Sequence, residues 1–226
     1  MSPMRESRVR PAIQAVKRGL LPAPGSRRIP AGIGRGLRLG VDFQTDTRLY
    51  LGMYEIELNR HLRGLCTPGT TSFDVGGCRG YDALVLARLT GSLVVSFEAD
   101  SAACERMRSN FSLNDEGSLI RIVEAMVGAP GADVTLDGST GEFGAPGFIK
   151  IDVDGGELEV LRGAEEILRE HRPSLIVETH SPQLEQQCGH FLADRGYEPL
   201  VVKQRTVWRE RRPDDNRWLV APAPRP

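Results

Sequence analysis

Short apolar runs alternate with amphipathic stretches along the chain from residue 70 onward. The apolar runs predict strands, and the stretches with apolar residues at helical spacing predict helices. Strands that alternate with helices form a mostly parallel sheet with helices on both faces. This alternation constrains the fold to the α/β class more strongly than any other feature of the sequence.

The predicted elements follow one another without an internal repeat. We predict strands at residues 72–75, 93–97, 119–127, 148–153 and 174–178, around 200–208, and at 217–221. We predict helices at residues 55–65, 81–89, 100–110, 157–170 and 182–195, and a loop at 138–147. Because no helix separates the last two strands, they are expected to pair as an antiparallel hairpin at the edge of the sheet.

The charge distribution sets the first part of the chain apart. Residues 1–40 hold nine Lys or Arg residues and one acid, together with several prolines and glycines. Such a segment struggles to bury a core, so we predict a solvated or loosely docked basic extension. Residues 41–69 are predicted to form a lead-in segment with one helix, and residues 70–226 the α/β domain.

Composition excludes several classes of protein. The net charge of -1 over 226 residues gives no general reason to expect a nucleic-acid partner. No apolar stretch reaches the roughly 18 residues that a membrane span needs, and the N-terminus does not resemble a secretory signal. The four cysteines show no CxxC spacing and are expected to be reduced thiols. We therefore expect a cytoplasmic protein without a membrane span.

A glycine-rich loop and an acid follow the first two strands of the domain. The loop is Asp74-Val75-Gly76-Gly77-Cys78-Arg79-Gly80, and the second strand ends at Glu98, 18 residues beyond Gly80. Glycines allow a tight turn and a close approach to a ligand. A carboxylate has two acceptor oxygens, which match the paired hydroxyls of a ribose. The pair therefore indicates a ligand that contains adenosine, and Asp74 is placed to accept a hydrogen bond from an ammonium group.

Charged residues alternate in an otherwise apolar stretch, at Lys150, Asp152 and Asp154. Alternate residues of a strand point to the same face, and the next strand ends with Glu178 and His180. We predict that four of these side chains form a polar cluster that faces the ligand: Asp152, Asp154, Glu178 and His180. The alternative is a structural ion pair of the lysine with strand-end caps. The four groups are conceivable metal ligands by type, but nothing in their spacing requires a metal and none is expected.

Taken together, these motifs resemble the FkbM family of S-adenosylmethionine-dependent methyltransferases. The matching stretches are Leu51–Glu55, Asp74–Gly80, Phe97-Glu98, Lys150–Glu157, Val160–Gly163 and Val177–His180. The resemblance begins near Leu39 and runs to the end of the chain. Two positions depart from the family pattern, since Cys78 stands where Asn is common and Asp154 where Glu is usual.

The resemblance implies a Rossmann-like class I methyltransferase fold, with a seven-stranded, mostly parallel sheet and an antiparallel C-terminal edge hairpin. It implies that residues 70–226 are the catalytic domain and transfer a methyl group from S-adenosylmethionine to a hydroxyl of a sugar, glycan or secondary metabolite. The cofactor-binding residues it implies are Asp74, Gly76, Gly77, Gly80, Glu98, Ala99, Ala125 and Asp152. Tyr54 and Glu55 would belong to the lead-in segment that lids the site.

A hydroxyl acceptor is a poor nucleophile until a base removes its proton. His180 is the first candidate because its unperturbed pKa lies near the working pH, with Asp154 and Glu178 behind it. The other histidines, His61, His171 and His190, lie in or beside predicted helices and are expected to be surface or packing residues.

Other functions stay open. A nicotinamide-dependent oxidoreductase or epimerase would use the same loop and acid, but the fingerprint lacks its second glycine and no tyrosine has a lysine four positions on. A degenerate methyltransferase fold would bind a partner or a nucleotide without catalysis. An RNA methyltransferase anchored by the basic segment is a weaker third alternative. The sequence does not identify the methyl acceptor.

Overall fold

The computed structural model describes residues 22–205 and 217–224. The first 21 residues of the basic extension and the end of the strand predicted around 200–208 lie outside the described residues. The described residues group into two compact units, with the division between Tyr54 and Glu55. The large sheet and the predicted polar cluster belong to the second unit.

The first unit contains a β-hairpin. Strand β1 (Gly25–Arg28) pairs antiparallel with β2 (Arg38–Val41), and the short helix α2 (Thr47–Tyr50) follows. Apolar residues alternate along β2, so Leu39 and Val41 are buried on one side. The second half of the basic extension therefore contains a folded hairpin, and the composition had indicated a solvated or loosely docked segment.

The second unit is built on a seven-stranded sheet in the order β5-β4-β3-β6-β7-β9-β8. The strands are β3 (Ser72–Val75), β4 (Val94–Glu98), β5 (Ile120–Glu124), β6 (Phe148–Ile151), β7 (Ser174–Thr179), β8 (Leu200–Lys203) and β9 (Arg217–Ala221). Strands β3 to β7 pair in parallel, and β9 pairs antiparallel with both β7 and β8. This confirms the predicted fold, and it adds that the last strand lies between β7 and β8.

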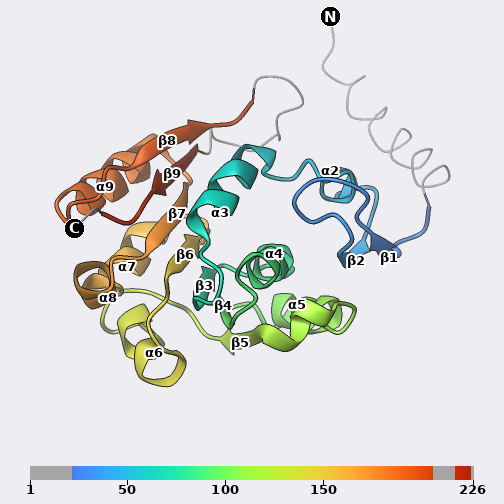
Figure 1. The fold of residues 1–226 in the computed structure, drawn as a ribbon, viewed down its shortest axis with the longest axis horizontal. Coiled ribbons are helices and arrows are strands. Elements are labelled where there is room, and N and C mark those ends of the chain that lie inside the picture. Colours follow the sequence, from blue (N-terminus) through green and yellow to red (C-terminus); the bar gives the residue numbers. More distant parts are fainter. Residues whose placement is uncertain (1–21, 206–216, 225–226) are drawn as a thin grey trace, which may run out of the picture. The chain divides into compact units, whose positions relative to one another are not determined.

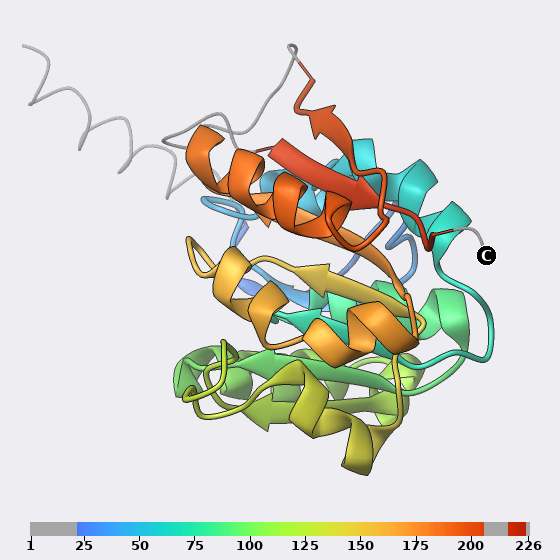
Figure 2. The same ribbon diagram turned by 90° about the vertical axis from the view of Figure 1, so that its left-hand side faces the viewer.

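Helices cover both faces of this sheet, with α4 and α5 on one side and α7, α8 and α9 on the other (Figures 1 and 2). Their bounds are α3 (Asn59–Leu65), α4 (Tyr81–Thr90), α5 (Ser101–Phe111), α6 (Leu136–Phe143), α7 (Glu157–Arg162), α8 (Glu165–Glu170) and α9 (Pro182–Ala193). Short 3₁₀ turns occupy Ile56–Leu58 and Asp115–Leu119. No helix among the described residues is long and apolar enough to cross a membrane.

The two faces of the sheet differ in chemistry. Apolar residues such as Phe73 and Ile149 pack with α7, α8 and α9 into one buried cluster. Their alternates along the strands point the other way, and there Asp74 lies in register between Ser96 and Lys150. The face that turns toward α4 therefore holds a row of buried polar side chains beneath the site.

Strand β6 is shorter than predicted because the chain turns after Ile151. The Asp152 N–H donates to the Val75 carbonyl oxygen, 2.8 Å away, and Asp154 and Gly155 follow with φ values of 49° and 111°. The prediction that Lys150, Asp152 and Asp154 share one strand face is therefore wrong for the last of them, which lies in a turn.

Two helical predictions also differ from the structure. Residues 138–147, predicted as a loop, contain most of α6, which Thr135 caps by accepting from the Gly138 N–H. The single helix predicted at 157–170 is two helices. The reason is Asp137 of α6, whose carboxylate accepts from the N–H groups of Glu166 and Ile167 and so starts α8 anew.

Candidate functional site

The site lies where the carboxyl ends of β3, β4, β6 and β7 meet. From β3 the chain moves outward to β4 and β5, and then returns to β6 on the other side of β3. Ligands of such sheets bind at the point where the strand order reverses. The loops after β3, β4, β6 and β7 contain most of the residues predicted from the sequence as a site.

The glycines of the loop after β3 are required by close packing of the protein on itself. A Cβ on Gly76 would lie 1.7 Å from the Asp152 carbonyl oxygen, and one on Gly77 would lie 2.5 Å from the Ser96 hydroxyl oxygen. A Cβ on Gly80 would lie 2.3 Å from the Phe111 ring. The sequence suggested a close approach to a ligand at these positions, and the structure adds that the loop also lies directly against its protein neighbours.

Glu98 joins this loop to the loop after β4. Its Oε2 accepts from the Cys78 N–H at 2.8 Å, and its Oε1 accepts from the Asp100 N–H at 2.9 Å. The carboxylate remains partly exposed, and each oxygen keeps a second lone pair for a further donor. Its position and chemistry fit the hydroxyl pair of a ribose.

Cys78 takes part through its backbone rather than its side chain. Its φ is 49° and its side chain is exposed. A left-handed conformation suits Asn better than Cys and costs most other residues roughly 1–2 kcal/mol. The Cys in place of the family's Asn therefore leaves the N–H contact to Glu98 intact and costs backbone strain instead.

The remaining predicted adenosine contacts sit beside Glu98. Ala99 is exposed at the end of β4, and the Ala125 N–H donates to the Glu98 carbonyl oxygen at 3.1 Å. Glu124, at the end of β5, accepts from the Ser101 hydroxyl and from Arg108 of α5. These hydrogen bonds lower the pKa of Glu124.

Asp74 is 1% exposed and accepts from the Ser96 hydroxyl at 2.6 Å. Burial raises the pKa of Asp74 to about 7, the nearby charge of Asp82 adds to the rise, and Lys150 opposes it. The Asp74 carboxyl therefore lies buried beneath the loop after β3. It contacts the Ser96 hydroxyl instead of solvent.

Lys150 is the centre of a buried ion cluster. Its Nζ lies 2.7 Å from Asp82 Oδ2, 3.4 Å from Glu55 Oε2 and 3.6 Å from Asp152 Oδ2. The lysine side chain is 2% exposed and that of Glu55 is 5% exposed. The structural ion pair considered from the sequence is thus present, and it adjoins the polar cluster instead of replacing it. Asp82 was not singled out because an acid in a first helical turn is ordinary.

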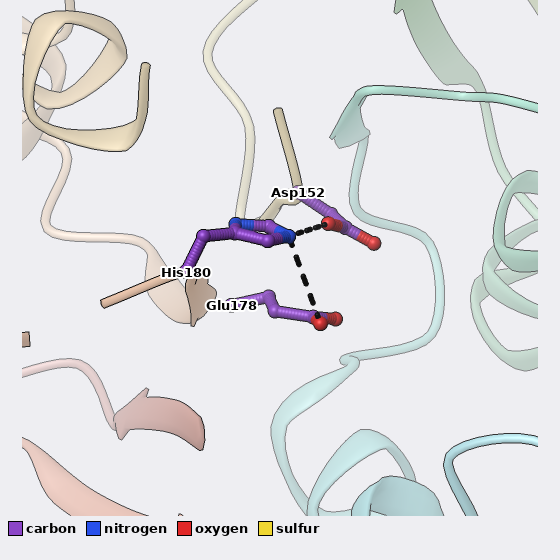
Figure 3. Close-up of side chains that lie close together, drawn as sticks. All are labelled: Asp152, Glu178 and His180. Atoms are coloured by element: carbon purple, nitrogen blue, oxygen red, sulfur yellow. Dashed lines mark ion pairs between the residues drawn. The ribbon is translucent and has the colours of Figure 1, made fainter. Parts of the chain in front are cut away.

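The predicted polar cluster forms around His180, with two of its partners shown in Figure 3. The Nε2 atom of His180 lies 3.0 Å from Asp154 Oδ1, 3.5 Å from Asp152 Oδ1 and 3.9 Å from Glu178 Oε1. The other nitrogen, Nδ1, lies 2.6 Å from Glu157 Oε1. Glu157 was not among the predicted site residues, because an acid at the start of a helix such as α7 is ordinary.

Burial differs sharply among these carboxylates. The side chains of Glu157 and Glu178 are 0% exposed, that of Asp152 is 19% exposed and that of Asp154 is 97% exposed. Trp218 Nε1 donates to Glu178 Oε2 at 3.1 Å and fixes that side chain. The cluster therefore has two buried acids beneath the imidazole and one solvent-facing acid beside it.

The surroundings of His180 and Glu157 favour the charged form of each side chain. Burial lowers the pKa of His180, but the hydrogen bond to Glu157 and the charges of Asp152, Glu157 and Asp154 outweigh it, so that pKa is raised. Burial raises the pKa of Glu157, yet its hydrogen bonds with His180 and with the Gly155 N–H outweigh this and lower it. The arrangement can hold a positive charge at the imidazole.

The other predicted residues lie outside this cluster. Tyr54 is the last residue of the first unit, and Glu55 begins the second. Glu55 adopts a φ of 42° and is buried against Lys150. Among the other histidines, His61 accepts from Arg60 Nε at 3.1 Å, and His171 is exposed.

Comparison with known families supports the resemblance. Residues 132–199 match the family described as the methyltransferase FkbM domain. This confirms the family resemblance over that part of the chain, which contains β6, β7 and the whole polar cluster. No curated protein sequence matches the chain.

Several solved structures share the fold. A SAM-dependent O-methyltransferase from Thermotoga maritima gives a TM-score of 0.59 at 15% identity, covering 84% of this chain and 74% of that one. A methyltransferase FkbM from Methylobacillus flagellatus gives a TM-score of 0.52 at 18% sequence identity, and the match covers 80% of this chain and 56% of that one. A precorrin-6y C5,15-methyltransferase from Geobacter metallireducens gives a TM-score of 0.52 at 12% sequence identity, and the match covers 74% of this chain and 86% of that one. The fold is that of the class I methyltransferases that use S-adenosylmethionine.

Proposed function

We propose that the protein transfers a methyl group from S-adenosylmethionine to a hydroxyl oxygen of a sugar, glycan or secondary metabolite. The observation that carries this proposal is the pairing of two features at one edge of the sheet. Glu98 and the glycine loop lie at the ends of β4 and β3, and the His180 cluster lies at the ends of β6 and β7. The first suits an adenosine, and the second suits a proton acceptor.

The cofactor-binding residues of the proposal are those carried over from the family resemblance. Glu98 would bind the ribose hydroxyls, and Ala99 and Ala125 would lie beside the adenine. The loop Gly76–Gly80 and Asp152 would enclose the methionine part. When bound, S-adenosylmethionine supplies an electrophilic methyl group on a sulfonium ion.

The chain's own task is to position the acceptor and take up its proton. In-line placement of two reactants can account for about 7–11 kcal/mol of a barrier. We assign proton uptake to the cluster of His180, Asp154 and Glu178. The imidazole comes first because its Nε2 lies 3.0 Å from Asp154, whose side chain is 97% exposed, and so lies close to solvent. Tyr54 and Glu55 are assigned to the segment that lids the acceptor.

The described cysteines Cys66, Cys78, Cys104 and Cys188 are all free thiols, which fits a reducing compartment such as the cytoplasm. The acceptor is proposed to be a small molecule or glycan, because the basic residues do not dominate the charge of the chain.

A direct assay tests the transfer. The full-length protein is incubated with S-adenosylmethionine and a panel of hydroxylated sugars, glycans and phenols, and mass spectrometry detects methylated products and S-adenosylhomocysteine. His180→Gln is expected to retain cofactor binding and lose transfer, whereas His190→Gln on α9 retains both. Cofactor binding without transfer to any member of the panel would contradict the proposed hydroxyl methylation and would favour the degenerate binding protein.

A further inference from the structure

We propose that Asp152, Glu178 and His180 form a binding site for one divalent transition-metal ion such as Mn²⁺ or Zn²⁺. Each residue offers one ligand atom, and these atoms all lie within 4.8 Å of one another. Figure 3 shows the three side chains converging from the ends of two neighbouring strands. The binding site stands on this geometry, and only its role in methyl transfer rests on the proposed function.

The separations between the ligand atoms match a metal centre. Nitrogen and oxygen ligands lie about 2.0–2.2 Å from such ions, so two ligands at a tetrahedral angle are about 3.4 Å apart. His180 Nε2 lies 3.5 Å from Asp152 Oδ1 and 3.9 Å from Glu178 Oε1. These two separations lie within about 0.5 Å of that spacing, and the two carboxylate oxygens lie no more than 4.8 Å apart.

Each carboxylate presents the appropriate oxygen to the imidazole. Asp152 turns Oδ2 toward Lys150, at 3.6 Å, and Oδ1 toward His180. Glu178 accepts from Trp218 through Oε2 and turns Oε1 toward His180. Both acids are therefore oriented by partners on their far side, as metal-binding carboxylates commonly are.

A second observation comes from Glu157, which lies behind the imidazole. Its carboxylate is 0% exposed, Oε1 lies 2.6 Å from His180 Nδ1, and Oε2 is buried without a hydrogen-bond partner. Histidines that bind metals almost always donate their other ring N–H to a carboxylate or carbonyl. A proton held on Nδ1 by Glu157 leaves the lone pair of Nε2 directed at Asp152 and Glu178.

Charge also favours a cation at this position. Asp152, Asp154, Glu157 and Glu178 all lie within 3.9 Å of one imidazole ring. A nitrogen lone pair that faces carboxylates is repelled unless a proton or a metal ion lies between them. The contact from Nε2 to Asp154 is the replaceable one, since that side chain is 97% exposed and can move aside.

The donor set indicates the class of ion. Two carboxylate oxygens and one imidazole nitrogen suit Mn²⁺, Fe²⁺ or Zn²⁺ better than Ca²⁺ or Mg²⁺, which prefer oxygen ligands alone. Three protein ligands leave at least one coordination position open. An acceptor hydroxyl bound there would lose its proton more readily, as metal-bound water does, and the proton would pass to the exposed Asp154 carboxylate beside the ring. In that form His180 acts as a ligand.

Metal binding is measured on the full-length protein after treatment with EDTA and its removal. Mn²⁺ is added alone, and electron paramagnetic resonance counts the free ion. We expect one equivalent to bind per chain, and we expect His180→Gln and Asp152→Asn each to weaken binding at least about tenfold. His190→Gln is the matched control and is expected to bind as the unmodified chain does. A Zn²⁺ titration by calorimetry repeats the comparison.

The outcomes separate this site from the proposed function. If neither Mn²⁺ nor Zn²⁺ binds at one equivalent, or if both cluster variants fold and bind as tightly as the unmodified chain, the metal site is refuted. S-adenosylmethionine binding is measured on the same metal-free protein. Cofactor binding without metal binding would overturn only the metal site, and metal binding without cofactor binding would overturn only the methyltransferase proposal.

Discussion

Oε1 of Glu157 lies 2.6 Å from Nδ1 of His180, and the Glu157 side chain has no exposed surface. A buried carboxylate in this position fixes the ring orientation and directs Nε2 toward Asp152 and Glu178. Glu157 touches neither the open side of the site nor the cofactor loop, so it is a positioning residue. Replacing Glu157 is therefore expected to change binding at Nε2, the opposite nitrogen of the His180 ring.

Glu157→Gln is expected to weaken Mn²⁺ binding by about 10–100-fold, because partners behind a ligating histidine contribute about that much. S-Adenosylmethionine affinity is expected to stay unchanged, since Glu98 lies on another strand end. Glu159→Gln, on an exposed side chain of the same helix, is the control. Equal Mn²⁺ affinity in the two variants would show that Glu157 has only a packing role.

Lys150→Met is expected to destabilise the fold by about 3–5 kcal/mol, because it removes the cation shared by the buried Glu55 and the partly buried Asp82 and Asp152. Arg169→Met is the control, since that ion pair with Glu170 is 65% and 57% exposed and worth about 0–1 kcal/mol. Urea unfolding at pH 7 measures both. A loss below about 1 kcal/mol in Lys150→Met would contradict the role of the lysine as the centre of the cluster.

Gly76→Ala is expected to lower the free energy of unfolding by at least about 3 kcal/mol, because the new Cβ overpacks the loop and the positive φ adds backbone strain. The new Cβ would lie 1.7 Å from the Asp152 carbonyl oxygen, at a φ of 91°. Gly91→Ala shares the positive φ but has nothing within 4 Å, so only the conformational cost of roughly 1–2 kcal/mol applies. Thermal unfolding that ranks the two variants equally would mean that the loops after β3 and β6 do not pack as described.

Asp74 is expected to make stability fall as the pH rises. Its pKa in the folded chain is about 7, above the ordinary value of 3.8, so between these values the folded state binds the extra proton. Stability from this group is therefore present below about pH 4 and lost as the pH rises toward 7, by an amount on the order of 2–4 kcal/mol.

Asp74→Asn keeps an acceptor for Ser96 and removes the titration. Relative to the unmodified chain it is expected to gain stability between pH 5 and pH 8 in urea unfolding. The exposed Asp115→Asn serves as control. A stability difference from the unmodified chain that does not change with pH would show that Asp74 does not titrate in this range.

The fold was largely predictable because strand identity depends on local pattern. The strands at 72–75 and 217–221 begin and end where the apolar runs do. The position of β9 between β7 and β8 was not predictable, since pairing beyond the nearest neighbour is decided by packing of the whole sheet. The split between α7 and α8 was missed because it depends on Asp137, a residue far away in sequence.

The candidate site was predictable where chemistry follows a strand end. Asp152, Glu178 and His180 were identified in this way, and the structure brings them together. Glu157 and Asp82 were missed because an acid at a helix start has a common local explanation, and only tertiary contacts give these two buried partners. Side-chain burial of this kind has no signature in a single sequence.

We infer that the chain binds S-adenosylmethionine through the loop after β3 and Glu98. Calorimetric titration of the full-length protein with S-adenosylmethionine, S-adenosylhomocysteine and NAD tests it most directly. We predict micromolar binding of the two sulfur compounds, no binding of NAD, and loss of binding in Glu98→Ala but not in Glu105→Ala, an exposed acid on α5. Binding of NAD in their place, or binding that survives in folded Glu98→Ala, would contradict the account.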